Sequence, residues 1–247
     1  MKKSTILILV VLGAILLLGL NYAFFSGMIL GLGPEVKAAL ESDAQVQVVE
    51  NKYLAFLPQG QTATTGLLFF PEGRQDVQTY AVPARAIAEE GYAVILMSRR
   101  GADIDADEEQ RLPTVMADFP EIENWVIGGH TWGGVVGSGY ALNHLDQFSG
   151  IVLWATRMDE LDLSGLDLPV LYVFGTNDDE NVAGELTAGK AHLPPDVVWV
   201  PVEGGNRVGF ASFGPMAADV GADITEAEQQ VQAAQATVEF LQQIVGK

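Results

Sequence analysis

One short stretch of the sequence, from Trp125 to Gly134, combines residues that could do chemistry. Its residues are Trp-Val-Ile-Gly-Gly-His-Thr-Trp-Gly-Gly, so the hydroxyl of Thr131 stands between Gly129 and Gly133. A nucleophilic hydroxyl on a sharp strand-to-helix turn needs such glycines, because the strand and the helix pass too closely for side chains. The N–H groups and the dipole of the following helix would favour negative charge beside Thr131. By itself, however, the pattern is a weak signal, because glycine-rich turns between a strand and a helix are frequent and the threonine in one usually caps the helix.

Short apolar runs on both sides of this stretch predict the strands that must position it. They are rich in Val, Ile and aromatic residues and end near Gly or Pro, as strands buried on both faces of a parallel sheet do. Two earlier runs predict an opening hairpin, and segments of helical character alternate with the later runs. This order predicts an α/β fold, with a mostly parallel sheet and helices on both faces. The hairpin runs are Gln45–Val49 and Tyr53–Leu57, and the later ones are Gly66–Phe70, Tyr92–Met97, Trp125–Gly129, Gly150–Ala155, Val170–Gly175 and Val197–Val202.

The helical segments are expected to bury one face each. The segment after Thr131 is expected to be helical from Gly133 to Leu142. Helical spacing predicts the following inward residues: Tyr80, Ala84, Ile87 and Ala88 in the segment Val77–Glu89, and Val231, Val238, Leu241 and Ile244 in the closing segment Ile224–Val245.

The composition narrows the classes of function. The chain has 247 residues, and 32 acidic against 13 basic residues give it a net charge of -19. Such a negative field repels phosphate backbones, so nucleic acid is not an expected partner. There is no cysteine, which excludes thiol nucleophiles and thiolate metal sites. One domain is expected over residues 45–247, and its oligomeric state is left open.

The N-terminal segment predicts a membrane anchor. Lys2 and Lys3 precede an uncharged run that extends from Ser4 to Leu30. This run is longer than the apolar region of most secretory leaders, so residues 1–30 are expected to form an uncleaved, single-pass transmembrane helix with the globular domain outside the cytoplasm. Secretion after cleavage of a leader is the alternative. Residues 31–44 are expected to be a linker, in which Pro34–Ala44 could form a short helix.

The order of these features resembles the α/β-hydrolase superfamily, in particular the family-5 branch related to dienelactone hydrolases. The similarity covers about Tyr53 to Leu241. Three stretches carry it most clearly, where the branch has G-G-H-S-L-G-G, G-T-x-D and G-G-N-H-x-x-F-G. The corresponding stretches here are Gly128–Gly134, Gly175–Asp178 and Gly204–Gly214.

The resemblance implies an α/β-hydrolase fold and hydrolysis of esters or related acyl compounds, with no cofactor or metal. It places Thr131 at the position of the serine nucleophile, Asp178 at that of the triad acid and Arg207 at that of the histidine. For Asp178, a structural role in the turn Thr-Asn-Asp-Asp is the alternative. The methyl group of Thr131 fits poorly at the positive φ of a nucleophile turn. The guanidinium of Arg207 has no lone pair and stays protonated, so it cannot serve as a general base.

A third departure lies in the loop Pro71-Glu72-Gly73, where the branch has Pro-Gly-Gly. The resemblance implies that this loop donates one N–H to the oxyanion, while Trp132 donates the other. The carboxylate of Glu72 would oppose the negative charge that develops there, unless it points to solvent.

Two functions remain open. In the first, the protein is non-catalytic, an ion pair of Asp178 with Arg207 replaces the acid–histidine contact, and the fold binds a small acyl or ester ligand. In the second, the protein is a slow or atypical ester or acyl hydrolase that uses Thr131. The remaining histidines, His130, His144 and His192, are expected to be structural or exposed. A metal or dinucleotide enzyme lacks support, because neither a ligand-spaced histidine cluster nor a dinucleotide fingerprint is present.

Overall fold

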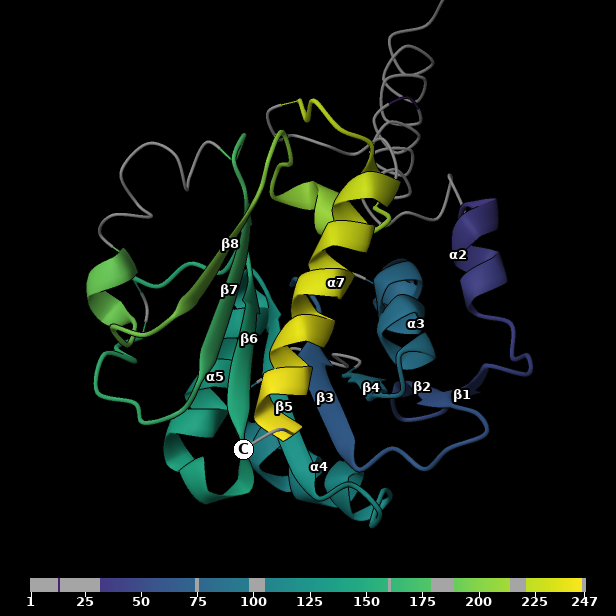
Figure 1. Ribbon diagram of the computed structural model, residues 1–247, viewed down its shortest axis with the longest axis horizontal. Coiled ribbons are helices and arrows are strands. Elements are labelled where there is room, and N and C mark those ends of the chain that lie inside the picture. The colour runs from purple at the N-terminus through teal and green to yellow at the C-terminus, as the bar shows by residue number, and fades with distance from the viewer. Residues whose placement is uncertain are drawn as a thin grey trace, which may run out of the picture.

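The computed structural model describes residue 13 and the segments 32–73, 76–97, 105–159, 161–178, 189–213 and 221–245, the side chains of 105–110 excepted. These segments form a central sheet with helices on both sides (Figure 1). The strands are β1 (Val46–Glu50), β2 (Leu54–Pro58), β3 (Thr65–Phe70), β4 (Ala93–Leu96), β5 (Asn124–His130), β6 (Gly150–Trp154), β7 (Val170–Gly175) and β8 (Val198–Val202). The α-helices are α2 (Pro34–Ala39), α3 (Ala81–Glu89), α4 (Asp105–Ala117), α5 (Trp132–Asn143) and α7 (Glu226–Val245). The 3-10 helices are η1 (Val77–Tyr80), η2 (Leu145–Gln147), η4 (Lys190–His192) and η5 (Val208–Phe210).

The strand order of the sheet is β1-β2-β4-β3-β5-β6-β7-β8. The hairpin of β1 and β2 is antiparallel, β2 pairs antiparallel with β4, and the pairs from β4 through β8 are all parallel. The predicted hairpin and the mostly parallel sheet are therefore confirmed. From β3 the chain first moves outward to β4 and then returns to β5 on the other side of β3. Open α/β sheets bind ligands beyond the carboxyl ends of the strands at such a reversal.

Helices cover both faces of the sheet, as expected. The helices α2, α3 and α7 pack into one apolar layer, and α4 and α5 belong to the opposite layer (Figure 1). The expected inward residues of the segment 77–89 are all buried. In α7 the expectation is confirmed for Val238, Leu241 and Ile244 and is wrong for Val231, which is 59% exposed. Gln229 and Gln230 are buried instead, because they bond to the loops beneath the start of the helix.

The N-terminal part of the fold prediction requires a correction. Among the described residues, no helix is both long enough and apolar enough to cross a membrane. The longest described helix, α7, has 20 residues but carries several Gln and Glu side chains along its length. The transmembrane helix expected over residues 1–30 is thus not supported, and that segment, Gly13 apart, lies outside the described residues. Of the segment expected to be a linker, Pro34–Ala39 forms the short helix α2, whose Val36 and Ala39 pack against the core.

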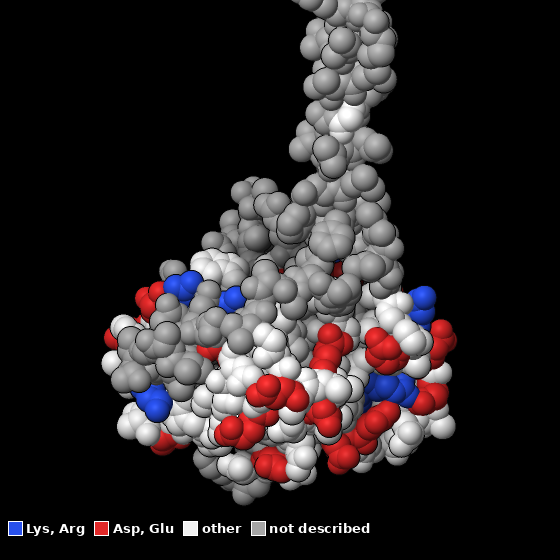
Figure 2. Space-filling view, turned by 90° about the horizontal axis from the view of Figure 1, so that it is seen from above, with Lys and Arg blue, Asp and Glu red and all other residues white. Residues whose placement is uncertain are grey.

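The described surface reflects the acidic composition. In Figure 2, Asp and Glu side chains are spread over the visible face, with Lys and Arg side chains between and beside them. Several of the basic side chains are paired, as in the salt bridges of Arg85 with Glu89 and of Lys52 with Asp118. The described part of this face therefore has no extended basic patch.

Candidate active site

Thr131 stands at the reversal of strand order, between the end of β5 and the start of α5. Its backbone has φ 49° and ψ -118°, a strained conformation for a β-branched residue that costs about 1–3 kcal/mol. The conformation is held by hydrogen bonds, because the Thr131 N–H donates to the Trp154 carbonyl at 3.0 Å and Gly134 N–H donates to the Thr131 carbonyl at 3.1 Å. Ala155, which follows β6, is the other non-glycine residue with positive φ in the described part of the chain. Strain is thus concentrated at this edge of the sheet.

The glycines on either side of Thr131 have the role that the sequence predicted. A Cβ atom on Gly129 would lie 2.5 Å from the Phe70 carbonyl oxygen, and one on Gly133 would lie 2.7 Å from the Phe70 carbonyl carbon. Both contacts are with backbone, which cannot swing aside as a side chain can. The close approach of β3, β5 and α5 therefore requires glycine at both positions.

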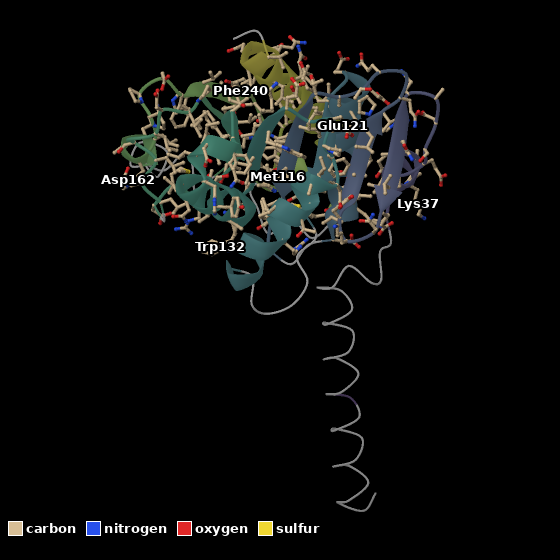
Figure 3. All side chains as sticks on the ribbon, turned by 90° about the horizontal axis from the view of Figure 1, so that it is seen from below. Lys37, Met116, Glu121, Trp132, Asp162 and Phe240 are labelled. Atoms are coloured by element: carbon tan, nitrogen blue, oxygen red, sulfur yellow. The ribbon has the colours of Figure 1, made fainter. Side chains whose placement is uncertain are left out.

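The side chains of Thr131 and Trp132 have opposite environments. Thr131 is 6% exposed, and its hydroxyl oxygen is buried without a hydrogen-bond partner among the described residues. The hydroxyl does not cap α5, although Thr131 is the N-cap residue. Trp132 is 44% exposed and lies at the surface, away from Phe240 of α7 (Figure 3). An unpaired buried hydroxyl costs about 1–3 kcal/mol, so stability alone does not explain it.

Asp178 and Arg207 lie at the same edge, since each follows a parallel strand. Asp178 comes after β7 and is 1% exposed, and Arg207 comes after β8 and is half-buried. Their loops are joined through backbone, because the Asn177 N–H donates to the Gly205 carbonyl at 2.8 Å. The fold thus brings all three positions named by the resemblance to one end of the sheet.

The loop of Arg207 is held from three sides. The side chain of Gln229 in α7 accepts from the Asn206 N–H at 3.0 Å and donates to the Asn206 carbonyl. The Asn206 side chain accepts from the Gly209 N–H at 2.8 Å. From the opposite direction, His130 contacts the carbonyl of Arg207, with 2.8 Å between Nε2 and the oxygen. The backbone around Arg207 is therefore held by β5, by α7 and by its own loop.

His130, the residue before Thr131, points into the core and not toward the Thr131 side chain. Its Nδ1 lies 2.8 Å from the hydroxyl of Tyr80, and the Tyr80 oxygen accepts the Glu72 N–H at 2.9 Å. Burial lowers the pKa of His130 to about 3, the bond to the Arg207 carbonyl opposes this change, and the Arg207 guanidinium adds to it. His130 is thus neutral near pH 7 and has both ring nitrogens engaged.

The loop after β3 adopts a tight turn beside the start of α5. Pro71 is buried and has no N–H, Glu72 is partly exposed, and Gly73 has φ 47°. Of the residues in this loop that were expected to contribute to an oxyanion site, Pro71 has no N–H to donate, and the Glu72 N–H is donated to the Tyr80 hydroxyl.

The sequence matches the model of the alpha/beta hydrolase family over residues 66–231. This range covers the reversal of strand order, the turn at Thr131 and the loops of Asp178 and Arg207. The chain belongs to the α/β-hydrolase family. No curated protein sequence matches it.

Several esterases are among the solved structures whose fold is similar to that of this chain. An esterase from Pyrobaculum calidifontis is 16% identical with a TM-score of 0.60, and the match covers 83% of this chain and 88% of that one. The esterase domain of a Rhodothermus marinus protein is 12% identical with a TM-score of 0.61, covering 81% and 99%. Est1E from Butyrivibrio proteoclasticus is 12% identical with a TM-score of 0.58, covering 82% and 100%. At these identities the likeness concerns the fold alone.

Two residues of this α/β-hydrolase site were not anticipated from the sequence. Tyr80 was expected only as part of an apolar stripe, and Gln229 was not singled out. A signal existed for Tyr80, because a histidine at the end of a buried strand needs polar partners. The partner lies 50 residues away in sequence, however, and only the fold identifies it. Within the described segments, no three His, Asp or Glu side chains are placed to hold a metal ion.

Proposed function

We propose that this chain is an α/β-hydrolase-fold protein with an altered triad, Thr131, Asp178 and Arg207, which binds a small acyl or ester ligand and does not hydrolyse it at ordinary enzymatic rates. The residue in the loop after β8 carries the proposal. Arg207 stands where a general base is needed, and its guanidinium stays protonated and has no lone pair. It cannot remove the proton from the Thr131 hydroxyl.

The three histidines of the chain do not replace the missing base. His130 is neutral but bonded through both ring nitrogens, to Tyr80 and to the Arg207 carbonyl. His144 caps the far end of α5, roughly 20 Å from Thr131 at about 1.5 Å per residue. His192 lies in η4, before β8, whereas the site is built from loops that follow strands. Loss of a general base typically costs about 10²–10⁴-fold in rate.

A slow ester or acyl hydrolase that uses Thr131 is the second candidate. It is favoured by the backbone of Thr131, which keeps the strained turn at φ 49°, and by the hydroxyl, which has no partner in the described part of the chain. A hydroxyl that is not held by a hydrogen bond is free to attack if water or a carboxylate accepts its proton.

The test compares the full-length protein with Thr131→Ser/Arg207→His, using a fluorophosphonate probe and a panel of activated short-chain esters. We expect no labelling of the unmodified protein. We expect the double variant to be labelled and to hydrolyse esters about 10²–10⁴-fold faster, because it regains both nucleophile and base.

Both single variants and Thr131→Ala serve as controls for the site of labelling. Labelling at Thr131 with ordinary turnover by the unmodified protein would show that the proposal is wrong. Slow, Thr131-dependent turnover would favour the second candidate instead.

A further inference from the structure

The hydrogen bonds that join Glu72, Tyr80, His130 and Arg207 determine which ring nitrogen of His130 carries a hydrogen and which partner the Tyr80 hydroxyl donates to. The Arg207 carbonyl can only accept, so His130 carries its hydrogen on Nε2. The unprotonated Nδ1 then accepts the hydroxyl hydrogen of Tyr80 at 2.8 Å. The Tyr80 oxygen in turn accepts the Glu72 N–H at 2.9 Å. These groups form a continuous chain from the loop after β3 to the loop after β8.

This chain lies in a dry, aromatic part of the core. Tyr80 is buried and packs edge-on against Phe213 at 5.8 Å between ring centroids, and His130 stacks on Phe213 at 6.2 Å. Burial raises the pKa of Tyr80 well above its usual value, so the phenol stays protonated. Two neutral groups in surroundings of low dielectric constant form hydrogen bonds that water does not weaken.

The chain has a direct consequence for the loop after β3. Pro71 has no N–H, and the Glu72 N–H is donated to Tyr80. An amide hydrogen committed to a buried phenol is not available to stabilise an oxyanion at Thr131. Removing one such donor typically costs about 10²–10³-fold in catalytic rate.

We propose that Tyr80 is a positioning residue of this site, which withholds the Glu72 amide from an oxyanion and, through His130, ties the loop of Glu72 to the loop of Arg207. The inference deepens the proposed function, on which it rests: the site is altered in its oxyanion loop as well as in its triad positions. It also predicts that Thr131→Ser/Arg207→His alone regains only part of the activity.

The experiment introduces Tyr80→Phe into the full-length protein and into Thr131→Ser/Arg207→His. Tyr53→Phe is the matched control, because it removes a phenol that donates to Asp118 at 3.1 Å, in the opposite apolar layer. In the double variant, Tyr80→Phe is expected to raise kcat/KM for an activated acetate ester at least tenfold, on the order of a recovered oxyanion donor. Tyr53→Phe is expected to leave kcat/KM unchanged.

A second measurement does not depend on activity. Tyr80→Phe is expected to accelerate amide hydrogen exchange at Glu72 in the otherwise unmodified protein. In the protein without any substitution, the ring nitrogen chemical shifts of His130 are expected to show the Nε2–H tautomer. Because the chemical shifts are measured on the protein without substitutions, they test the inference even if Tyr80→Phe does not fold.

The outcomes separate this inference from the proposed function. The inference is wrong if His130 is the Nδ1–H tautomer or if Tyr80→Phe does not change the rate of amide hydrogen exchange at Glu72. Both outcomes are independent of the activity of the protein. Faster exchange without a gain in kcat/KM, or variants that stay inactive with and without Tyr80→Phe, also overturns the inference. The proposed function fails if the unmodified protein is an efficient hydrolase, and it gives way to the second candidate if turnover is slow and depends on Thr131. In either case the effect of Tyr80→Phe is measured on that activity.

Discussion

The turn at Thr131 and the loop at Arg207 lie at the same edge of the sheet but differ in how their polar groups are satisfied. At the turn, a β-branched residue is held at φ 49° and its buried hydroxyl has no partner in the described part of the chain. In the loop, Gln229 pairs with both backbone groups of Asn206, and His130 pairs with the carbonyl of Arg207. The turn thus has a costly backbone geometry, whereas the loop is a rigid support that carries the half-buried side chain of Arg207.

This difference indicates that backbone geometry and side-chain chemistry are separable in this site. The turn is enforced by the approach of β3, β5 and α5 and is part of the packing of the fold. The backbone of the Arg207 loop is held by the side chains of His130 and Gln229. Three predictions test how the turn and the loop are held.

The largest expected effect is a dependence of stability on pH that originates at His130. Its folded-state pKa, about 3, lies below the value of 6.5 for an unperturbed histidine, so the unfolded chain binds a proton first as the pH falls. This contribution to stability is present above pH 6.5 and is lost at roughly 1.4 kcal/mol per pH unit down to about pH 3. Urea unfolding between pH 7 and 4 should show that His130→Gln has a shallower loss than the unmodified protein. Equal slopes would mean that burial and the hydrogen bonds to Tyr80 and the Arg207 carbonyl do not hold His130 neutral.

The second prediction concerns the support of the Arg207 loop. Gln229→Leu removes the two hydrogen bonds that the Gln229 side chain makes to the buried N–H and carbonyl of Asn206, which should lower the free energy of unfolding by about 2–3 kcal/mol. Gln235→Leu, on the exposed face of the same helix, is the control and should change it by less than about 0.5 kcal/mol. Denaturant unfolding measures both. Similar values for the two variants would show that the loop does not depend on α7.

The smallest expected effect has the opposite sign and lies at the turn. Thr131→Val replaces an unpaired buried hydroxyl with a methyl group of similar size, so it should raise the free energy of unfolding by about 1 kcal/mol. The same change at Thr237 should lower it, because that hydroxyl donates to the Ala233 carbonyl at 2.8 Å and accepts from Trp154 Nε1 at 3.2 Å. Thermal unfolding compares the pair. A loss of stability in both variants would show that the Thr131 hydroxyl is satisfied in the folded protein.

Much of the site could be predicted from the sequence where the information is local. Gly129 and Gly133 mark a close approach of backbone, and Thr131 between them marks the turn, because both follow from steric rules over a few residues. The strands were predictable because short, continuously apolar runs rich in Val, Ile and aromatic residues are typical of strands buried on both faces of a sheet. Val231 was wrongly predicted to face inward, since helical spacing gives a stripe but does not decide which of two adjacent stripes meets the core.

The sequence by itself determined the order of strands and helices, the glycine turn at Thr131 and the absence of a proton acceptor at Arg207, because each depends on residue type and short spacing. Only the tertiary structure decided that Tyr80, His130 and Gln229 join loops far apart in the chain. Their hydrogen bonds span 50, 77 and 23 residues. Such contacts exist only after the strands have aligned in the sheet, since the sheet brings the loops to one edge and excludes the water that would otherwise satisfy these groups.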